Sequence, residues 1–339
     1  MNRRQIAVLG FLGSLAVMGL LLSIVGLERI GTALSTASPG LLALVGLFGL
    51  GQVSAWGLSL RTVMGSLDEP VSRRKGIALY ASAMFANNVT PFGQAGGEPV
   101  TAYVINRVTD TRFETGLAAI ATVDAAHVFT SISIAVTGGL LTVTVFSPNQ
   151  QLTLVVLGVL GLGVAVGVAG SLLVRYRRSI ARGLEVPVAD AIHRLGAAFP
   201  DRLANLLQTA RSRFANFQGD LGRIAANQRT LVLALGYSTA GWLFEVGALS
   251  LALWGLGGPV PVATVLVIIP VGKLAGFVPL PGGFGSIEAM LVGLLVATTP
   301  VAGGMATAAV LLHRAATYWL PTILGGSVSL ALGVTTRWG

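Results

Sequence analysis

Glu98 and Glu288 each end a segment of the form Pro-x-Gly-x-x-x-x-Glu, and the two copies lie 190 residues apart in apolar sequence. Proline and glycine break a hydrophobic helix, and a carboxylate in hydrocarbon is costly without a partner or water. Broken segments at corresponding places in two halves of a chain point to a transport site. The backbone positions expected to shape the two breaks are Pro91, Gly93, Gly97, Pro281, Gly282, Gly283 and Gly285.

Charged residues near the two breaks are further candidates for chemistry. Asp124 and Arg314 are also separated by 190 positions, so the segment after each break carries one charge. Opposite charges lose much of their desolvation penalty by pairing, which predicts that these two side chains are neighbours. Lys273 closely follows Pro270. This proline favours an open backbone and a wet cavity around the Lys273 ammonium group. Glu245 and His127 are weaker candidates.

Each candidate also has a structural interpretation. Glu98 and Glu288 lie where a second half-helix begins, so either carboxylate could cap exposed N–H groups there. The same helix end also attracts a phosphate, so capping and binding are compatible. Asn87 and Asn88 either cap the first half-helix or bind polar headgroup atoms, and Asp124 with Arg314 could form a purely structural ion pair.

The composition indicates a polytopic membrane protein. The 339 residues are 53% hydrophobic and 10% charged, with a mean hydropathy of +0.79. The formal net charge of +9 is concentrated: 10 of the 22 basic residues fall between Arg175 and Arg229. This distribution favours a cytoplasmic loop near anionic lipid, and no nucleic-acid partner is expected. Leucine, phenylalanine and arginine spacing within 175–229 predicts a basic amphipathic helix, with either a scaffold or a regulatory role.

Apolar runs of spanning length predict an all-α protein with six full crossings and two interrupted segments, within a single membrane domain of residues 1–339. The interrupted segments are 77–106 and 259–299. The crossings are expected near 6–27, 39–60, 114–146, 151–174, 230–254 and 304–334.

Basic residues cluster near residue 3, between 61 and 75, in the 175–229 loop and at Arg337. The positive-inside rule therefore places the long loop and both termini in the cytoplasm of a cell-membrane protein. This orientation requires both interrupted segments to be re-entrant hairpins that enter and leave on one side. Residues 39–146 and 230–334 would then form an inverted-topology repeat.

Three further motifs can be compared with known families. They are Asn87-Asn88-Val-Thr-Pro91-x-Gly93 with Gly97-Glu98, then Val278-Pro279-Leu-Pro281-Gly282-Gly283-x-Gly285-x-x-Glu288-Ala289, and His313-Arg314 through Tyr318-Trp319-x-Pro321 to Gly325. By these motifs the chain resembles, over about residues 40–335, the flippase-like integral membrane family that includes the transmembrane region of lysylphosphatidylglycerol synthase, also attached to some archaeal dolichol-phosphate glycosyltransferases. The chain departs from the family pattern at Asp124 and His127, where a Glu-Arg pair and a later Asp are often found.

The resemblance implies movement of a lipid headgroup across the bilayer. The chain shows no metal-ligand spacing, phosphate-binding loop or nucleophile motif, so neither a cofactor nor a metal is expected, and we interpret it as a transporter, not an enzyme. The expected ligand is an anionic or sugar-phosphate lipid of polyprenyl or aminoacylated type. The alternatives are an intramembrane transferase acting on polyprenyl-phosphate sugars and a scaffold for a soluble glycosyltransferase or lipid-modifying partner. The candidate substrate-binding residues are Asn87, Asn88, Glu98, Asp124, Lys273, Glu288, Arg314 and Tyr318.

Overall fold

The computed structural model describes residues 28, 32, 35, 37–90, 94–145, 149–168 and 200–331, without the side chains of 94–96 and 200–211. The described residues form helices and contain no β-strand. The crossing predicted at 6–27 lies outside them, as do Pro91, Gly93 and residues 169–199.

The first half consists of α3 (Pro39–Ser66), α4 (Arg73–Val89), α5 (Gln94–Thr109) and α6 (Phe113–Val145). A further helix, Gln150–Val168, follows α6. Ser38 caps α3 by accepting a hydrogen bond from the Leu41 amide, and Ser72 caps α4 in the same way. These serines satisfy N–H groups that a helix leaves without internal partners, which explains where both helices begin.

The second half follows α8 (Pro200–Ala226) and begins with α9 (Gln228–Gly255). Its broken segment comprises α10 (Val262–Lys273), the 3₁₀ turns η1 (Leu274–Phe277) and η2 (Pro281–Gly283), and α11 (Ser286–Thr298). The chain ends with α12 (Gly303–Arg314), the π-helical turn η3 (Ala315–Trp319) and α13 (Leu320–Ala331).

Five helices among the described residues are long and apolar enough to cross a membrane. Four of them coincide with predicted crossings, and the fifth, Pro281–Thr298, was expected to be a hairpin arm. The crossing predicted at 304–334 is helical over its described part, but η3 divides it into α12 and α13, which are too short to be counted separately. The predicted number of six crossings therefore stays a prediction.

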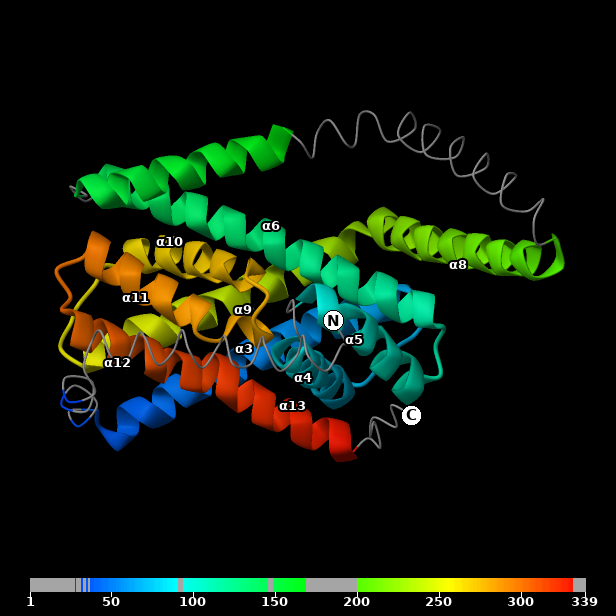
Figure 1. The fold of residues 1–339 in the computed structure, drawn as a ribbon, viewed down its shortest axis with the longest axis horizontal. Helices are drawn as coiled ribbons and strands as arrows, with labels where there is room; N and C mark the ends of the chain where they lie inside the picture. The colour runs from blue at the N-terminus through cyan, green and yellow to red at the C-terminus, as the bar shows by residue number, and fades with distance from the viewer. Residues whose placement is uncertain are drawn as a thin grey trace.

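The two interrupted segments form helical hairpins. In the first, α4 and α5 pack against each other, and in the second α10 packs against α11. The hairpins lie toward opposite ends of the long axis of the molecule (Figure 1). The end of α4 meets η2, where a Cβ atom at Gly282 would approach the Asn88 Cα atom to 2.9 Å. Gly282 has a φ of 55°, so glycine is favoured there by both backbone geometry and space.

The centre of the bundle is the long contact between α3 and α9, the first helices of the two halves. A side chain at Gly241 of α9 would overlap the Trp56 ring of α3. The Trp56 indole N–H donates to the Ser238 carbonyl at 3.3 Å, and the Ser59 hydroxyl donates to the Ala234 carbonyl at 3.3 Å. Close helix approach at small residues and hydrogen bonds between helices are typical of packing in membranes.

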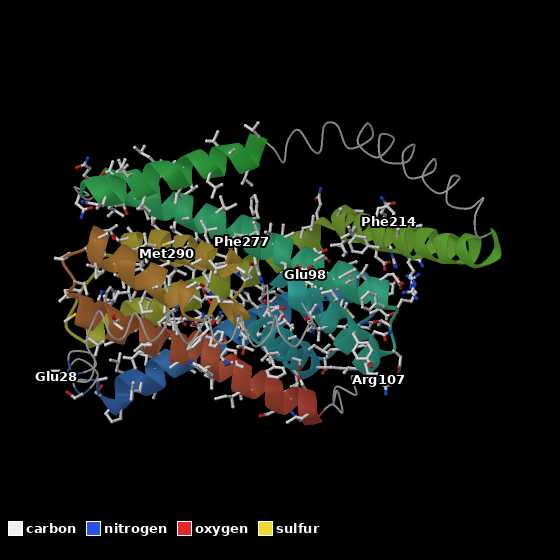
Figure 2. The ribbon with its side chains drawn as sticks, in the orientation of Figure 1. Glu28, Glu98, Arg107, Phe214, Phe277 and Met290 are labelled. Carbon is white, nitrogen blue, oxygen red and sulfur yellow. The ribbon has the colours of Figure 1, made fainter. Side chains whose placement is uncertain are left out.

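The basic amphipathic helix predicted within 175–229 is present as α8, and its C-terminal part packs on α6. Asp220 is buried, accepts a hydrogen bond from the Thr115 hydroxyl at 2.8 Å, and lies 3.5 Å from the Arg112 guanidinium. Phe214, by contrast, is 61% exposed on α8 (Figure 2). The helix is therefore anchored to the bundle at one end and presents an apolar side chain outside it.

Candidate functional site

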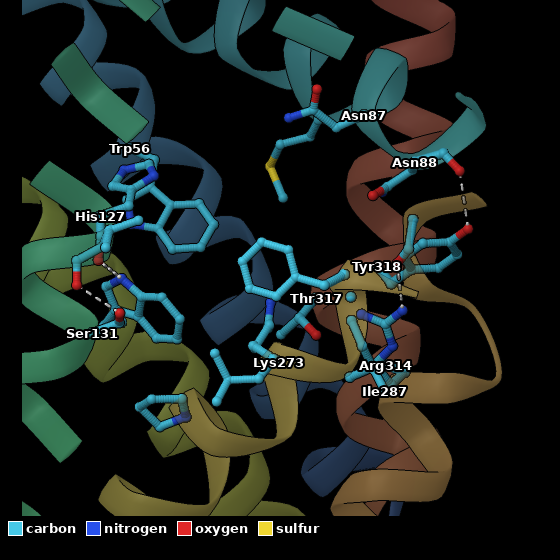
Figure 3. Close-up of a pocket in the computed structure, with 18 of the residues that line it drawn as sticks. Trp56, Asn87, Asn88, His127, Ser131, Lys273, Ile287, Arg314, Thr317 and Tyr318 are labelled. Carbon is cyan, nitrogen blue, oxygen red and sulfur yellow. Dashed lines mark hydrogen bonds between the residues drawn. The ribbon is translucent and has the colours of Figure 1, made fainter. Parts of the chain in front are cut away.

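A pocket of about 280 Å³ lies where the two hairpin breaks meet (Figure 3). Asn87 and Asn88 come from the end of α4, Lys273 from the end of α10, and Arg314 and Tyr318 from the junction of α12 with η3. The pocket is close to the lower end of the ~300–1,000 Å³ range of small-molecule sites. Its other described lining residues are Trp56, Tyr80, Met84, His127, Val128, Ser131, Trp242, Pro270, Leu274, Gly276, Phe277, Gly282, Ile287 and Thr317.

Lys273 is held by a carboxylate behind the pocket. Its ammonium group donates to Glu245 Oε1 at 2.6 Å and lies 5.8 Å from the centre of the Trp242 ring. The Gln52 amide donates to the same carboxylate oxygen at 2.5 Å. Glu245 is fully buried, whereas the Lys273 side chain is 25% exposed. Because a buried carboxylate needs a compensating charge, the ion pair with Glu245 positions the Lys273 ammonium group at the pocket.

Arg314 is fixed in a comparable way. Its Nε donates to Glu288 Oε1 at 2.6 Å, and its guanidinium carbon lies 4.3 Å from the centre of the Tyr318 ring. The other Glu288 oxygen accepts the Gly285 backbone N–H at 2.6 Å, at the start of α11. Glu288 therefore caps α11, as the structural interpretation predicted, and also orients a cation that lines the pocket.

The predicted pairing of Asp124 with Arg314 is wrong. Arg314 binds Glu288, whereas Asp124 lies beside the Glu98 side chain and 3.8 Å from His127 Nδ1. The cause is packing within each half: α11 lies against α12, and α5 lies against α6.

The two asparagines lie in the last turn of α4, whose C-cap residue is Thr90. The Asn88 amide donates to the Thr322 hydroxyl at 2.7 Å, and the Asn88 carbonyl accepts from the Tyr318 hydroxyl at 3.4 Å. Asn88 thus connects the first hairpin break to η3 and α13. Asn87 also lines the pocket, and its buried side-chain oxygen, which has no hydrogen-bond partner in the described structure, packs against Gly97 of α5.

The pocket brings together Asn87, Asn88, Lys273, Arg314 and Tyr318. Glu98, Asp124 and Glu288 are not among its described lining residues. Sequence reasoning missed its aromatic lining: Trp56 lies 6.0 Å from Trp242 and 5.9 Å from Tyr80 between ring centres. The spacing of Gln52, Trp56 and Ser59 could have indicated this lining, because it places three side chains with hydrogen-bonding groups on one face of a helix.

The long apolar helices, the paired charges buried among them and the two broken hairpins define a multi-pass helical membrane protein. The sequence matches the family model of the lysylphosphatidylglycerol synthase transmembrane region over residues 7–325, so the chain belongs to that family.

Three archaeal relatives align with this chain over most of their own length. A UPF0104 membrane protein of Methanothermobacter thermautotrophicus is 29% identical over 96% of this chain and 92% of the relative. A second UPF0104 membrane protein from the same organism is 25% identical over 94% of this chain and 93% of the relative. A UPF0104 membrane protein of Pyrococcus horikoshii is 22% identical over 82% and 83%.

Proposed function

We propose that this protein moves a lipid with an anionic or sugar-phosphate headgroup across the bilayer, as a flippase or scramblase. The observation that carries the proposal is the central pocket, in which Lys273 and Arg314 approach one cavity from the two sides of the second hairpin break. A phosphate is a strong acceptor that both cations can bind. We propose the cell membrane as its location, with both termini in the cytoplasm.

The charges at the pocket suit reversible binding. Lys273 and Arg314 are each paired with one buried carboxylate, so the four charges balance while N–H donors remain available. The rings of Trp56, Trp242 and Tyr318 provide apolar faces for the rest of a headgroup. A transported ligand must leave as well as enter, and a charge-balanced pocket avoids trapping an anion.

Matching contacts in the two halves support an inverted repeat. The first hairpin arm α4 packs on α13, the last helix of the second half, and α10 packs on α6, the last helix of the first half. The carboxylate in each second arm contacts the charged residue of the helix that follows, as Glu98 with Asp124 and Glu288 with Arg314. Alternating access follows from two inverted halves that move around one central site.

Replacing Lys273 with methionine and Glu245 with glutamine in one protein tests the proposal. The double variant removes both charges, leaves no buried carboxylate unpaired, and should insert correctly. Loss of a charged hydrogen bond to phosphate costs about 1.5–3 kcal/mol, so lipid movement should slow at least about tenfold. The measurement is dithionite quenching of fluorescent phosphatidylglycerol in reconstituted vesicles.

Lys75→Met is the matched control, because Lys75 donates to the Val108 carbonyl outside the pocket. It should move lipid at the wild-type rate. Equal rates for the double variant and the wild type would contradict the proposed site. Sugar transfer by wild-type protein that moves no lipid would favour a transferase, and activity only with a soluble glycosyltransferase would favour a scaffold.

The proposed topology is tested by accessibility of introduced cysteines, since the chain contains none. A cysteine in the 107–113 link should react with an impermeant reagent from the cytoplasmic side, like one in 62–76. A cysteine in 299–303 should react from outside, like one in 255–258. Labelling of 107–113 from outside would mean that α4 and α5 cross the membrane, and the inverted repeat would be rejected.

A further inference from the structure

A second cavity, an apolar groove of about 230 Å³, lies between α6, α10 and the helix Gln150–Val168. It is lined by Ser131, Ile132, Ala135, Val155, Gly158, Val159, Leu162, Pro270, Val271 and Leu274. None of these residues is charged. The Ser131 hydroxyl donates to the Val128 carbonyl at 2.8 Å, so the one polar side chain among the described residues of the groove already has a partner.

The groove adjoins the central pocket. Ser131, Pro270 and Leu274 line both cavities, and Ser131 lies on the α6 side of the pocket (Figure 3). The groove also reaches the surface, because Leu162, on the helix Gln150–Val168, is 43% exposed. A cation-bearing pocket thus lies next to an apolar groove that opens beside a helix long enough to cross the membrane.

We propose that the groove holds an aliphatic chain of the same lipid molecule whose phosphate headgroup occupies the central pocket. This inference rests on the proposed function and adds to it the place where the hydrocarbon chain of the lipid lies. A water-soluble phosphate ester would leave the groove unused. Each methylene group buried in the groove strengthens binding roughly fourfold, so chain length contributes strongly to affinity.

Gly158 offers a way to close the groove without disturbing the fold. A Cβ atom at Gly158 would meet nothing within 4 Å, so a phenylalanine side chain can extend into the empty groove. Gly161 is a matched control on the same helix: its Cβ position is equally open, it is exposed, and it does not line the groove. Both substitutions replace glycine with the same residue, so their effects on helix propensity are comparable.

The experiment measures binding of dioleoylphosphatidylglycerol, glycerophosphoglycerol and dioleoylglycerol to purified full-length protein in detergent. We expect Gly158→Phe to weaken binding of dioleoylphosphatidylglycerol at least about tenfold, which corresponds to two buried methylene groups. Its affinity for glycerophosphoglycerol, which has the headgroup without chains, should be unchanged. Gly161→Phe should bind both probes like the wild type.

Two outcomes separate this inference from the proposed function. Unchanged binding of dioleoylphosphatidylglycerol by Gly158→Phe would overturn the groove as the chain site. If dioleoylglycerol, which lacks phosphate, binds wild-type protein as tightly and remains sensitive to Gly158→Phe, the chain site stands and the phosphate site at Lys273 and Arg314 is rejected.

Discussion

Arg314→Gln should lower the free energy of unfolding by about 3–5 kcal/mol, the usual cost of removing one partner of a buried ion pair. Glu288 would keep only the Gly285 amide as a partner, at a position that is 1% exposed. Glu288→Gln should lose a similar amount, because it leaves the buried guanidinium group without a counter-charge. The measurement is thermal or denaturant unfolding of purified protein in detergent.

The double variant Glu288→Gln with Arg314→Gln should recover part of the loss, because neither charge then remains buried alone. The control pair is Arg213 with Glu114, 3.5 Å apart, in which the arginine side chain is 64% exposed. Arg213→Gln should cost about 1 kcal/mol or less, as expected for a surface ion pair. Strictly additive losses at Glu288 and Arg314 would show that their contact contributes no coupling energy.

Glu98→Gln and Asp124→Asn should each leave a folded, inserted protein that moves lipid at least about tenfold more slowly, equivalent to ~1.4 kcal/mol in the barrier. An amide has nearly the size of a carboxyl group and can still donate and accept hydrogen bonds, so the fold should be retained. The ionisable carboxyl group is lost, however. If this pair carries a coupling proton, the pH dependence of wild-type lipid movement should also disappear in both variants.

Glu114→Gln is the control for this experiment, because Glu114 lies on the same helix as Asp124 and faces Arg213. It should retain both the wild-type rate and the wild-type pH dependence. The measurement is lipid movement in reconstituted vesicles from acidic to alkaline pH. Wild-type rates for Glu98→Gln and Asp124→Asn would restrict both carboxyl groups to a structural role and leave the site with Lys273 and Arg314.

The sequence alone determined the elements of this protein. Because backbone polar groups in hydrocarbon must be satisfied within the segment, long apolar runs have to be helices, and α3, α6 and α9 lie where their hydropathy predicts. The two proline- and glycine-containing breaks were predictable for the same reason. The cap at Glu288 also followed from local sequence, since an acidic residue in the first turn satisfies the amides of its own helix.

Only the tertiary structure decided which charges meet. The equal spacing of Asp124 and Arg314 suggested one ion pair across the molecule, but a side chain can pair only within reach of the helix packed beside it. Because α11 packs against α12, Arg314 pairs with Glu288. Because α5 packs against α6, Asp124 lies beside Glu98. The pocket and its apolar groove were likewise invisible in the sequence, because their walls come from helices far apart along the chain.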